Sequence, residues 1–491
     1  MKISFPFRIY FIALILRLIP ILLARGLGIG LDDMFQYDML ARSISSGHGF
    51  RWYAQEDLKT LAPYLDFDLS AAEDYDPQNG IYTSFRAPLY PVFLAFVYYF
   101  SAPGVSRFLF ARLAQAVFLG APLAPLTYEV AKHLSLFSRS SGLKEEVDNK
   151  IERVAQASAW IVACYPMLLV YPLGLGTENP FFVLLLASFL FLLKSIGQPT
   201  RKYLFLSGFF LALTALTRSV ILLFAGLAIF YLIYLHRRKA LLVGIVFTLV
   251  IMPWVVRNSL LHNQLTGIET SMGYNLYLGY HPQGNGSFIF GPSLDLLSIM
   301  DDSERDQVGM HKAISFIIET PERFFPLIIN RLGFFFGLEK RVLMYFYSNN
   351  LVGYISTPVL LIISAVLLLP FVFISVSALL GFSLMRWNSQ TILLLLLLTL
   401  YLLPHIFILA EDRFHLALIP FCAILGTQFW AVGFQAISAR WHESIRGRWL
   451  TALLLLGIFL LILNWGFELS RDADKIAVLL APAGNESHFP Y

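Results

Sequence analysis

Apolar runs of about 20 residues recur along most of this 491-residue chain, separated only by short polar joints. The composition is 57% hydrophobic and 14% charged, which lies outside the range of soluble domains. We therefore expect an all-α polytopic membrane protein with about 11 transmembrane helices. The first run, Phe7–Ala24, contains Arg17 and is followed by no small-residue cleavage pattern. This predicts a retained span and not a signal peptide.

Lysine and arginine gather in alternate joints, and such residues mark the cytoplasmic side of a membrane protein. The apolar run Tyr90–Phe100 is too short to cross the bilayer, so we expect a re-entrant or interfacial helix there and a crossing span at Ser106–Ala131. The pattern then predicts an odd number of spans, with the N-terminus inside and the C-terminus outside. The basic joints are Lys2 with Arg8, 132–153, 194–202, 236–239, Arg386 and 440–448.

Two predicted outer segments exceed the usual length of a connector, and long loops of this kind tend to be functional. They are a first outer loop at residues 31–105 and a second at residues 254–326. No repeat, low-complexity tract or soluble domain separates the spans. We expect one membrane domain over residues 1–491, with a catalytic first loop, a substrate-binding second loop and short juxtamembrane helices in both.

Chemistry is first indicated by Leu31-Asp-Asp-Met-Phe-Gln-Tyr37, where two adjacent carboxylates follow the first span. Either Asp32 or Asp33 can cap the helix that the following residues predict, and Tyr37 lies one turn after Asp33 on the same side. Capping alone is the simpler interpretation. It needs only one carboxylate, however, and an ionised carboxylate at a helix start can also accept a proton.

Two arginines lie where predicted spans meet the outer loops. Arg86 is in Thr83-Ser-Phe-Arg-Ala-Pro-Leu-Tyr-Pro91, and Arg257 is in Pro253-Trp-Val-Val-Arg-Asn258. A guanidinium group presents a planar set of donors that matches phosphate oxygens and stays charged. The alternative for Arg86 is an interfacial arginine that reaches lipid headgroups.

The second outer loop is aromatic near its start and acidic further along. Trp254, Tyr274 and Tyr277 fit an interfacial aromatic belt, or together with Asn275 the floor of a sugar site. We interpret Asp301-Asp-Ser-Glu-Arg-Asp306 as a solvated helix face. A site for Mg²⁺ or Mn²⁺ is only weakly supported, so we expect no tightly bound metal and activity that survives a chelator.

Ionisable residues also interrupt two later apolar runs. Glu178 follows Thr177 at an outer span end, and Glu411-Asp-Arg-Phe-His415 breaks the run between Tyr401 and Ile424. A charge near mid-bilayer costs on the order of 3 kcal/mol and less at the edge, so something offsets it. Pairing of Glu411 or Asp412 with Arg413 is the purely structural explanation.

The order of these motifs resembles the C superfamily of polytopic glycosyltransferases (GT-C), in the branch related to protein O-mannosyltransferases and the lipid A aminoarabinose transferase. The resemblance extends over nearly the whole chain, and its pieces are specific only as an ordered set. They are Asp33 with Tyr37, Ala41, Ser46-Gly-His-Gly-Phe50, Arg86-Ala-Pro-Leu-Tyr-Pro-Val-Phe-Leu94, Thr177-Glu178, Leu213-Thr-Ala-Leu-Thr-Arg218, Pro253-Trp-Val-Val-Arg-Asn258, Gly273-Tyr-Asn-Leu-Tyr277 and Glu411-Asp-Arg-Phe-His-Leu-Ala-Leu-Ile-Pro420.

The resemblance implies transfer of a sugar, with inversion, from a polyprenyl-phosphate donor to a lipid, glycan or protein acceptor on the outer face of the plasma membrane. It implies Asp33 as general base, although Asp32 leaves open which acid is used, and Arg86, Arg257 and Arg413 as ligands of the donor phosphate. It implies no nucleic-acid partner. The segment Trp52–Asn79 is longer than the family leads us to expect. Candidate substrate contacts are Tyr37, His48, Tyr90, Glu178, Asn258, Tyr274, Asn275 and Glu411.

A flippase or transporter of a lipid-linked sugar is the alternative, since it would also be polytopic with intramembrane charges. Transporters place their charges near mid-bilayer on discontinuous helices, often in repeated halves. Here the charges lie at span ends and in two long loops, and no repeat is seen. This favours the transferase.

Overall fold

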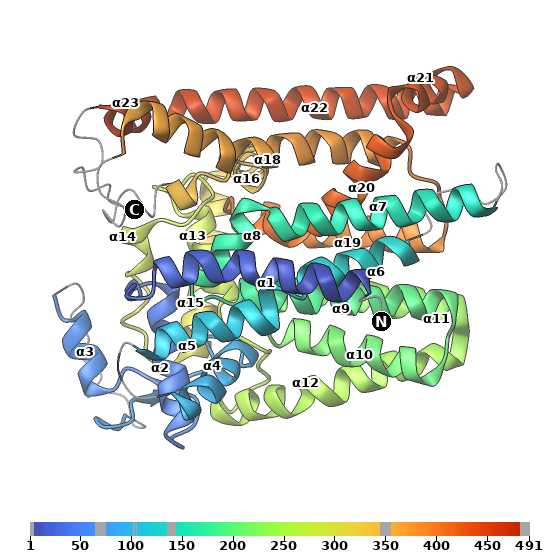
Figure 1. Cartoon of the computed structure of the whole chain (residues 1–491). Coiled ribbons are helices and arrows are strands. Elements are labelled where there is room, and N and C mark those ends of the chain that lie inside the picture. The colour runs from blue at the N-terminus through green and yellow to red at the C-terminus, as the bar shows by residue number, and fades with distance from the viewer. Residues whose placement is uncertain are drawn as a thin grey trace.

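The computed structural model of the protein describes residues 4–63, 75–101, 104, 106–134, 144–343 and 355–481. Long helices lie roughly parallel across the view of Figure 1, and shorter elements gather at one end of them. The long bundle consists of α1 (Phe5–Leu23), α5 (Ser106–Gln115), α6 (Leu123–His133), α7 (Lys144–Cys164), α8 (Pro166–Val170), α9 (Glu178–Gly197), α10 (Arg201–Ala215), α11 (Leu222–His236), α12 (Leu241–Leu261), α16 (Phe324–Phe335), α18 (Thr357–Ser383), α19 (Ser389–Phe407), α20 (Ile419–Val432), α21 (Phe434–Glu443) and α22 (Ile445–Arg471).

The elements at the end of the bundle come mainly from the two segments expected to lie outside the membrane. The only strands in the described ranges are β1 and β2, which pair antiparallel with Arg51 opposite Tyr82. These elements are α2 (Asp33–Ser45), β1 (Arg51–Trp52), α3 (Gln55–Leu61), β2 (Ile81–Tyr82), α4 (Leu89–Phe100), α13 (Met272–Tyr280), α14 (Phe290–Ser293), α15 (Asp302–Glu319) and α23 (Ala473–Leu480).

The protein is an all-α, multi-pass membrane protein. Eight helices in the described residues are long and apolar enough to cross a bilayer, or nine if the bent pair of α7 and α8 is one crossing. One of the eight is the 43-residue stretch Ser219–Leu261, which reverses at Arg237, where φ is +54°. The expectation of about eleven crossings is therefore higher than the eight or nine candidates in the described residues; α10, which packs between α9 and α12, has only 15 residues and is not one of them.

The first outer segment follows the expectation for its short apolar run. α4 is a 12-residue helix, too short to span, and the stretch Ser106–His133 supplies the crossing instead. A π-helix at Ala116–Gly120 interrupts that stretch.

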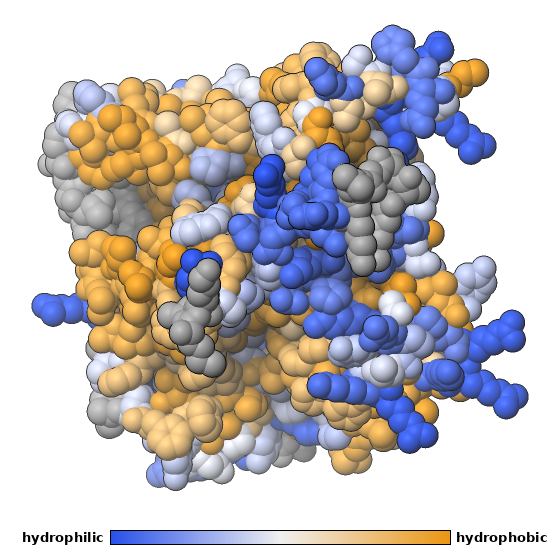
Figure 2. Space-filling model, turned by 45° about the vertical axis from the view of Figure 1, so that its right-hand side comes forward, coloured by the Kyte–Doolittle hydropathy of each residue, from blue (hydrophilic) through white to orange (hydrophobic). Residues whose placement is uncertain are grey.

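The bundle has a closely packed centre and an apolar outer surface. The apolar windows of α9 and α20 are 72% and 78% buried, and Phe189 of α9 packs edge-on against Phe421 of α20. The windows of α18 and α22 are only 17% and 11% buried. Figure 2 shows hydrophobic atoms over much of one side and hydrophilic atoms over the end that comes forward at the right. This distribution suits helices that face lipid.

The two ends of the bundle differ in the way the basic joints predict. The exposed side chains of Arg201, Lys202 and the turn Arg237–Lys239 lie at the end opposite α2 and α13. α1 begins at that basic end, whereas α23 lies at the other end (Figure 1). An odd number of crossings would place the start of α1 and helix α23 at opposite ends of the bundle in this way.

Asp302 connects the two outer segments. Its position differs from the expectation for Asp301–Asp306. Its side chain is 3% exposed and accepts hydrogen bonds from the Thr83 hydroxyl at 2.6 Å and the Ser84 backbone N–H at 2.8 Å. Arg305 pairs with it at 2.8 Å. The prediction of a wholly solvated face was wrong, because the run of acids gives no sign of donors more than 200 residues away. Asp301, by contrast, caps α15 through the Glu304 N–H.

The crossing of α13 and α15 depends on two glycines. A Cβ on Gly273 would lie 1.8 Å from the Asp306 carbonyl oxygen, and one on Gly309 would lie 2.7 Å from the Gly273 backbone. We expect Gly273→Ala to force the helices apart and lower the free energy of unfolding by about 1–3 kcal/mol. Thermal unfolding in detergent measures the loss. Gly291→Ala, whose Cβ meets nothing within 4 Å, is the matched control, and equal melting of the two variants would contradict this packing.

Candidate functional site

The two aspartates at the start of α2 have different positions. Asp32 is the N-cap, and its carboxylate accepts a hydrogen bond from the Met34 N–H at 2.9 Å. Asp33 is the first helical residue, and its carboxylate turns toward the bundle, where it pairs with Arg86. The cap of α2 and the contact with Arg86 therefore belong to different residues.

Arg86 is held by the first turns of α2. Its Nη2 contacts the Asp33 carboxylate, and its Nε donates to Gln36 Oε1 at 2.8 Å. The Arg86 guanidinium also lies 5.3 Å from the centre of the Tyr37 ring. Because Gln36 follows Asp33 by three residues, both acceptors lie on one face of α2.

Arg413 reaches the same carboxylate from the far end of the sequence. Its Nη2 lies 3.5 Å from Asp33 Oδ2, and its Nε lies 2.7 Å from Glu411 and 3.5 Å from Glu178. Glu178, at the start of α9, is in turn paired with Arg218 at 2.8 Å. The expected pairing of Glu411 with Arg413 is confirmed, but Arg413 also connects three acids from separate elements.

Arg341 extends the cluster on the side of residues 411–413. Its Nη2 lies 3.1 Å from Glu411, and its Nε lies 3.5 Å from Asp412. We call the connected set of Asp33, Arg86, Glu178, Arg218, Arg341, Glu411, Asp412 and Arg413 the Asp33 cluster. It contains four carboxylates and four guanidinium groups, so the cations are held in place without an excess of either charge.

An aromatic wall borders the Asp33 cluster. The rings of Tyr37 and Tyr90 meet edge-on at 5.1 Å, and the Tyr37 hydroxyl lies 3.5 Å from Thr177 Oγ1, next to Glu178. Tyr90 is fully buried and donates to Gln115 at 2.7 Å. On another side, Tyr274 packs against Phe85 at 5.4 Å and donates to the Ser293 carbonyl. Tyr37 therefore lies beside Arg86, and Tyr90 packs against Tyr37.

The charge of Asp33 is set by its arginine neighbours. Burial raises the pKa of this carboxyl group, but the cations of Arg86 and Arg413 outweigh burial and hold the pKa at about 2. With a lowered pKa in the folded state, ionised Asp33 stabilises the fold above its ordinary pKa near 3.9 and loses that contribution as the pH falls toward 2.

The difference in melting temperature between the wild type and Asp33→Asn is therefore expected to be constant from pH 8 to about pH 5 and to shrink below about pH 4. Thermal unfolding over a pH series measures it. A difference that changes between pH 6 and 8 would show that Asp33 is not held ionised by these arginines.

Four predicted site residues lie apart from the Asp33 cluster. Arg257 donates to the Thr83 carbonyl at 2.6 Å and to Asn258, while Asn258 binds the carbonyls of Gly267 and Ile268, so these two fasten the end of α12. His48 lies beyond the C-terminal end of α2, at a separate pocket. Asn275 is a partly buried residue of α13.

Gln36 and Arg341 were not predicted from the sequence. Gln36 could have been found from its i, i+3 spacing to Asp33. Arg341 carries no such signal, since it begins a separate helical stretch after the irregular residues 337–340 that follow α16.

The charged groups of the described residues include no cluster of three or more histidine, cysteine, aspartate or glutamate side chains suited to a metal ion. The acids of the Asp33 cluster are each paired with an arginine. Such pairing suits anion binding by the arginines better than cation binding by the acids.

No protein-family model matches the chain, and no curated protein matches it. Among solved structures, the chain is similar to the crystal structure of ArnT from Cupriavidus metallidurans bound to undecaprenyl phosphate. The two are 12% identical, the alignment covers 88% of this chain and 78% of that one, and the TM-score is 0.37.

Proposed function

We propose that the protein transfers a sugar, with inversion, from a polyprenyl-phosphate donor to an acceptor hydroxyl or related group at the outer face of the plasma membrane. The observation that carries the proposal is the contact of one carboxylate, Asp33, with two arginines, Arg86 and Arg413, at the end of an apolar bundle. A carboxylate can take a proton there, and guanidinium groups can hold a phosphate beside it.

The proposed reaction is a single displacement. Asp33 accepts the proton of the acceptor hydroxyl while the oxygen of that hydroxyl attacks the anomeric carbon of the donor. The bond between that carbon and the phosphate oxygen breaks, and the polyprenyl phosphate leaves with the electron pair. Arg86 and Arg413 stabilise the negative charge that develops on the leaving phosphate. The polyprenyl chain of the donor would lie in the bilayer alongside the helices.

The contacts of Asp33 with Arg86 and Arg413 also mean that donor binding can make Asp33 a stronger base. A carboxyl group with a pKa of about 2 is a weak base, because its charge is already stabilised by Arg86 and Arg413. A donor phosphate that draws these guanidinium groups toward itself weakens that stabilisation and adds a nearby negative charge. Both changes raise the pKa of Asp33, so the base becomes effective only when the donor is bound.

The remaining residues of the cluster position these groups. Glu178 and Glu411 hold Arg413, and Arg218 and Arg341 balance the charges of those acids. Tyr274 is proposed to line the space for the sugar and the acceptor, and the buried Tyr37 and Tyr90 to support the wall behind it. We propose no bound metal, since Arg86 and Arg413 are placed to stabilise the charge of the leaving phosphate.

The function is tested in proteoliposomes with a polyprenyl-phosphate donor that carries a radiolabelled sugar. Transfer predicts that label moves to an acceptor glycan, lipid or protein while free polyprenyl phosphate appears in equal amount. The same sugar on a nucleotide diphosphate is the control donor and should not be used. Label that crosses the bilayer still attached to its polyprenyl phosphate would identify a flippase and overturn the proposal.

A further inference from the structure

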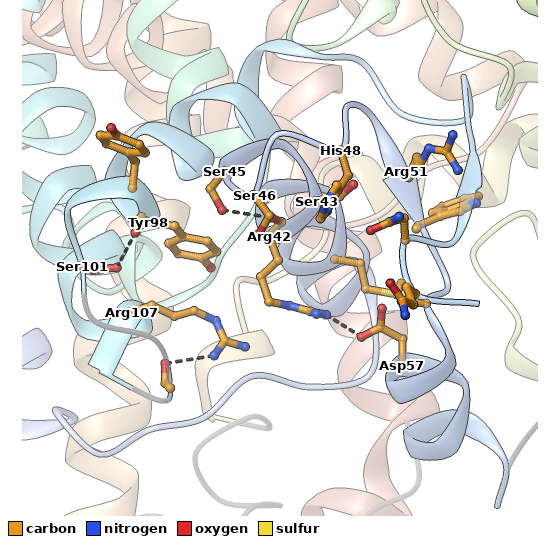
Figure 3. A pocket seen from close by; sticks show the side chains of 17 residues that line it. Arg42, Ser43, Ser45, Ser46, His48, Arg51, Asp57, Tyr98, Ser101 and Arg107 are labelled. Carbon is orange, nitrogen blue, oxygen red and sulfur yellow. Dashed lines mark hydrogen bonds and ion pairs between the residues drawn. The ribbon is translucent and has the colours of Figure 1, made fainter. Parts of the chain in front are cut away.

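A second polar pocket lies at the other end of α2 from Asp33. It encloses about 470 Å³, within the range of ligand sites, and is drawn in Figure 3. Arg42 lies nine residues after Asp33, which places it roughly 13 Å further along the helix. The pocket lining includes Arg42, Ser43, Ser45, Ser46, His48 and Arg51, together with Asp57, Gln78, Asn79, Tyr98 and Arg107.

Two arginines of this pocket, Arg42 and Arg107, are held by a buried carboxylate behind the pocket wall. Asp38 is buried, with a side chain only 1% exposed, and binds Arg42 at 2.9 Å and Arg107 at 2.8 and 2.9 Å. Tyr98 donates to the same carboxylate at 3.0 Å. The side chains of Arg42 and Arg107 are 33% and 20% exposed, so their guanidinium groups keep access to the pocket while Asp38 does not.

The pocket wall has more cationic than anionic groups. Arg51 stacks over Tyr82 at 3.7 Å and donates to the Gly80 carbonyl, which fixes a third guanidinium group at the wall. Asp57, bound to Arg42 at 2.5 Å, is the one acid among the lining residues. The Ser43 hydroxyl is buried and has no hydrogen-bond partner among the described residues. Cationic side chains therefore outnumber acidic ones where a ligand would lie.

The mouth of the pocket lies beside the expected membrane surface. Phe96, Tyr99 and Phe100 of α4 are 66%, 74% and 73% exposed, as suits an interfacial helix, and Tyr99 also lines the pocket. Part of the wall, including Trp52, Asp57 and Asn79, comes from the segment that is unexpectedly long in this chain. The pocket is thus a feature that this segment adds to the first outer loop.

We propose that this pocket binds the acceptor through an anionic sugar, one that carries a phosphate or a carboxylate group. The proposal rests on the proposed function, because an acceptor bound here would extend along α2 toward Asp33. The guanidinium groups and His48 bind the anionic group, the serine hydroxyls and the amides bind sugar hydroxyls, and the ring of Tyr99 covers an apolar sugar face.

The test is isothermal titration of the full chain in phosphatidylcholine nanodiscs with hexose 6-phosphate. Arg51→Gln and His48→Ala are expected to weaken binding about tenfold or more. The exposed Lys59→Gln of α3 is the matched control and should bind as the wild type does. Asp33→Asn should also bind normally, which separates this site from the catalytic one.

Absence of binding, or equal binding by the wild type and both pocket variants with unchanged melting temperatures, would overturn the proposal. Equal affinity for a neutral methyl hexoside, or for inorganic phosphate alone, would also overturn it. Competition by a phosphorylated glycolipid in the nanodisc would support a lipid-borne acceptor, and competition by a soluble acidic oligosaccharide would support a glycan. If no donor is ever used, the titration still decides the site independently of the reaction.

Discussion

Asp33→Asn is expected to lower sugar transfer by about 10²- to 10⁴-fold, because an amide cannot accept the proton of the acceptor hydroxyl. Asparagine keeps the size of the side chain and one oxygen for Arg86, so the site should stay assembled. The measurement is the initial rate of transfer from a radiolabelled polyprenyl-phosphate sugar at matched protein levels. The loss should fall on kcat more than on the KM for the donor.

Asp32→Asn is the matched control for this prediction. Asparagine is as good an N-cap as aspartate, and the Asp32 carboxylate serves as the cap of α2. We expect transfer near the wild-type rate and an unchanged melting temperature. Normal transfer by Asp33→Asn, or an equal loss in both variants, would refute the assignment of Asp33 as the base.

The largest expected effect on stability is at a buried group behind the Asp33 cluster. Glu339 and His415 have side chains only 1% and 2% exposed, and His415 Nε2 lies 3.0 Å from Glu339 Oε1. Tyr165 donates to the same oxygen at 2.6 Å. Burial raises the pKa of Glu339, and the His415 contact partly offsets this. His415→Leu should therefore lower the free energy of unfolding by about 3 kcal/mol.

The control is the double variant Glu339→Leu/His415→Leu, which removes both polar groups. Replacing a buried pair by apolar residues is often close to neutral, so the double variant should melt higher than His415→Leu. Thermal unfolding in detergent measures both. Arg341 follows Glu339 by two residues, and Arg413 precedes His415 by two. Loss of the Glu339–His415 contact should therefore disturb the Asp33 cluster, and transfer by His415→Leu should also fall. A double variant that melts lower than the single one would contradict a burial cost at Glu339.

Much of the fold follows from local sequence. The length of an apolar run decides whether a helix can cross the bilayer, so the bundle, the short α4 and the span after it were all predictable. The Asp33 cluster was partly predictable for a related reason. Charges beside apolar spans are costly unless they meet partners, and Asp33, Arg86, Glu178 and Arg413 do meet.

The rest depends on contacts between distant segments. From the local sequence Asp302 is indistinguishable from a surface acid, because its partners Thr83 and Ser84 come from a distant segment. Arg341 has no periodic pattern around it. His48 was grouped with Asp33 through motif order, but α2 carries it to the other end of the helix. Register along a helix separates such residues even when they belong to one loop.

The most direct measurement is an experimental structure of Asp33→Asn in nanodiscs with a polyprenyl-phosphate sugar bound. The proposed reaction predicts that the donor phosphate contacts Arg86 and Arg413 and that the anomeric carbon faces residue 33 on the side opposite the phosphate. A donor phosphate held elsewhere, at the basic end of the bundle or at mid-bilayer, would contradict the proposal that the Asp33 cluster is the catalytic site.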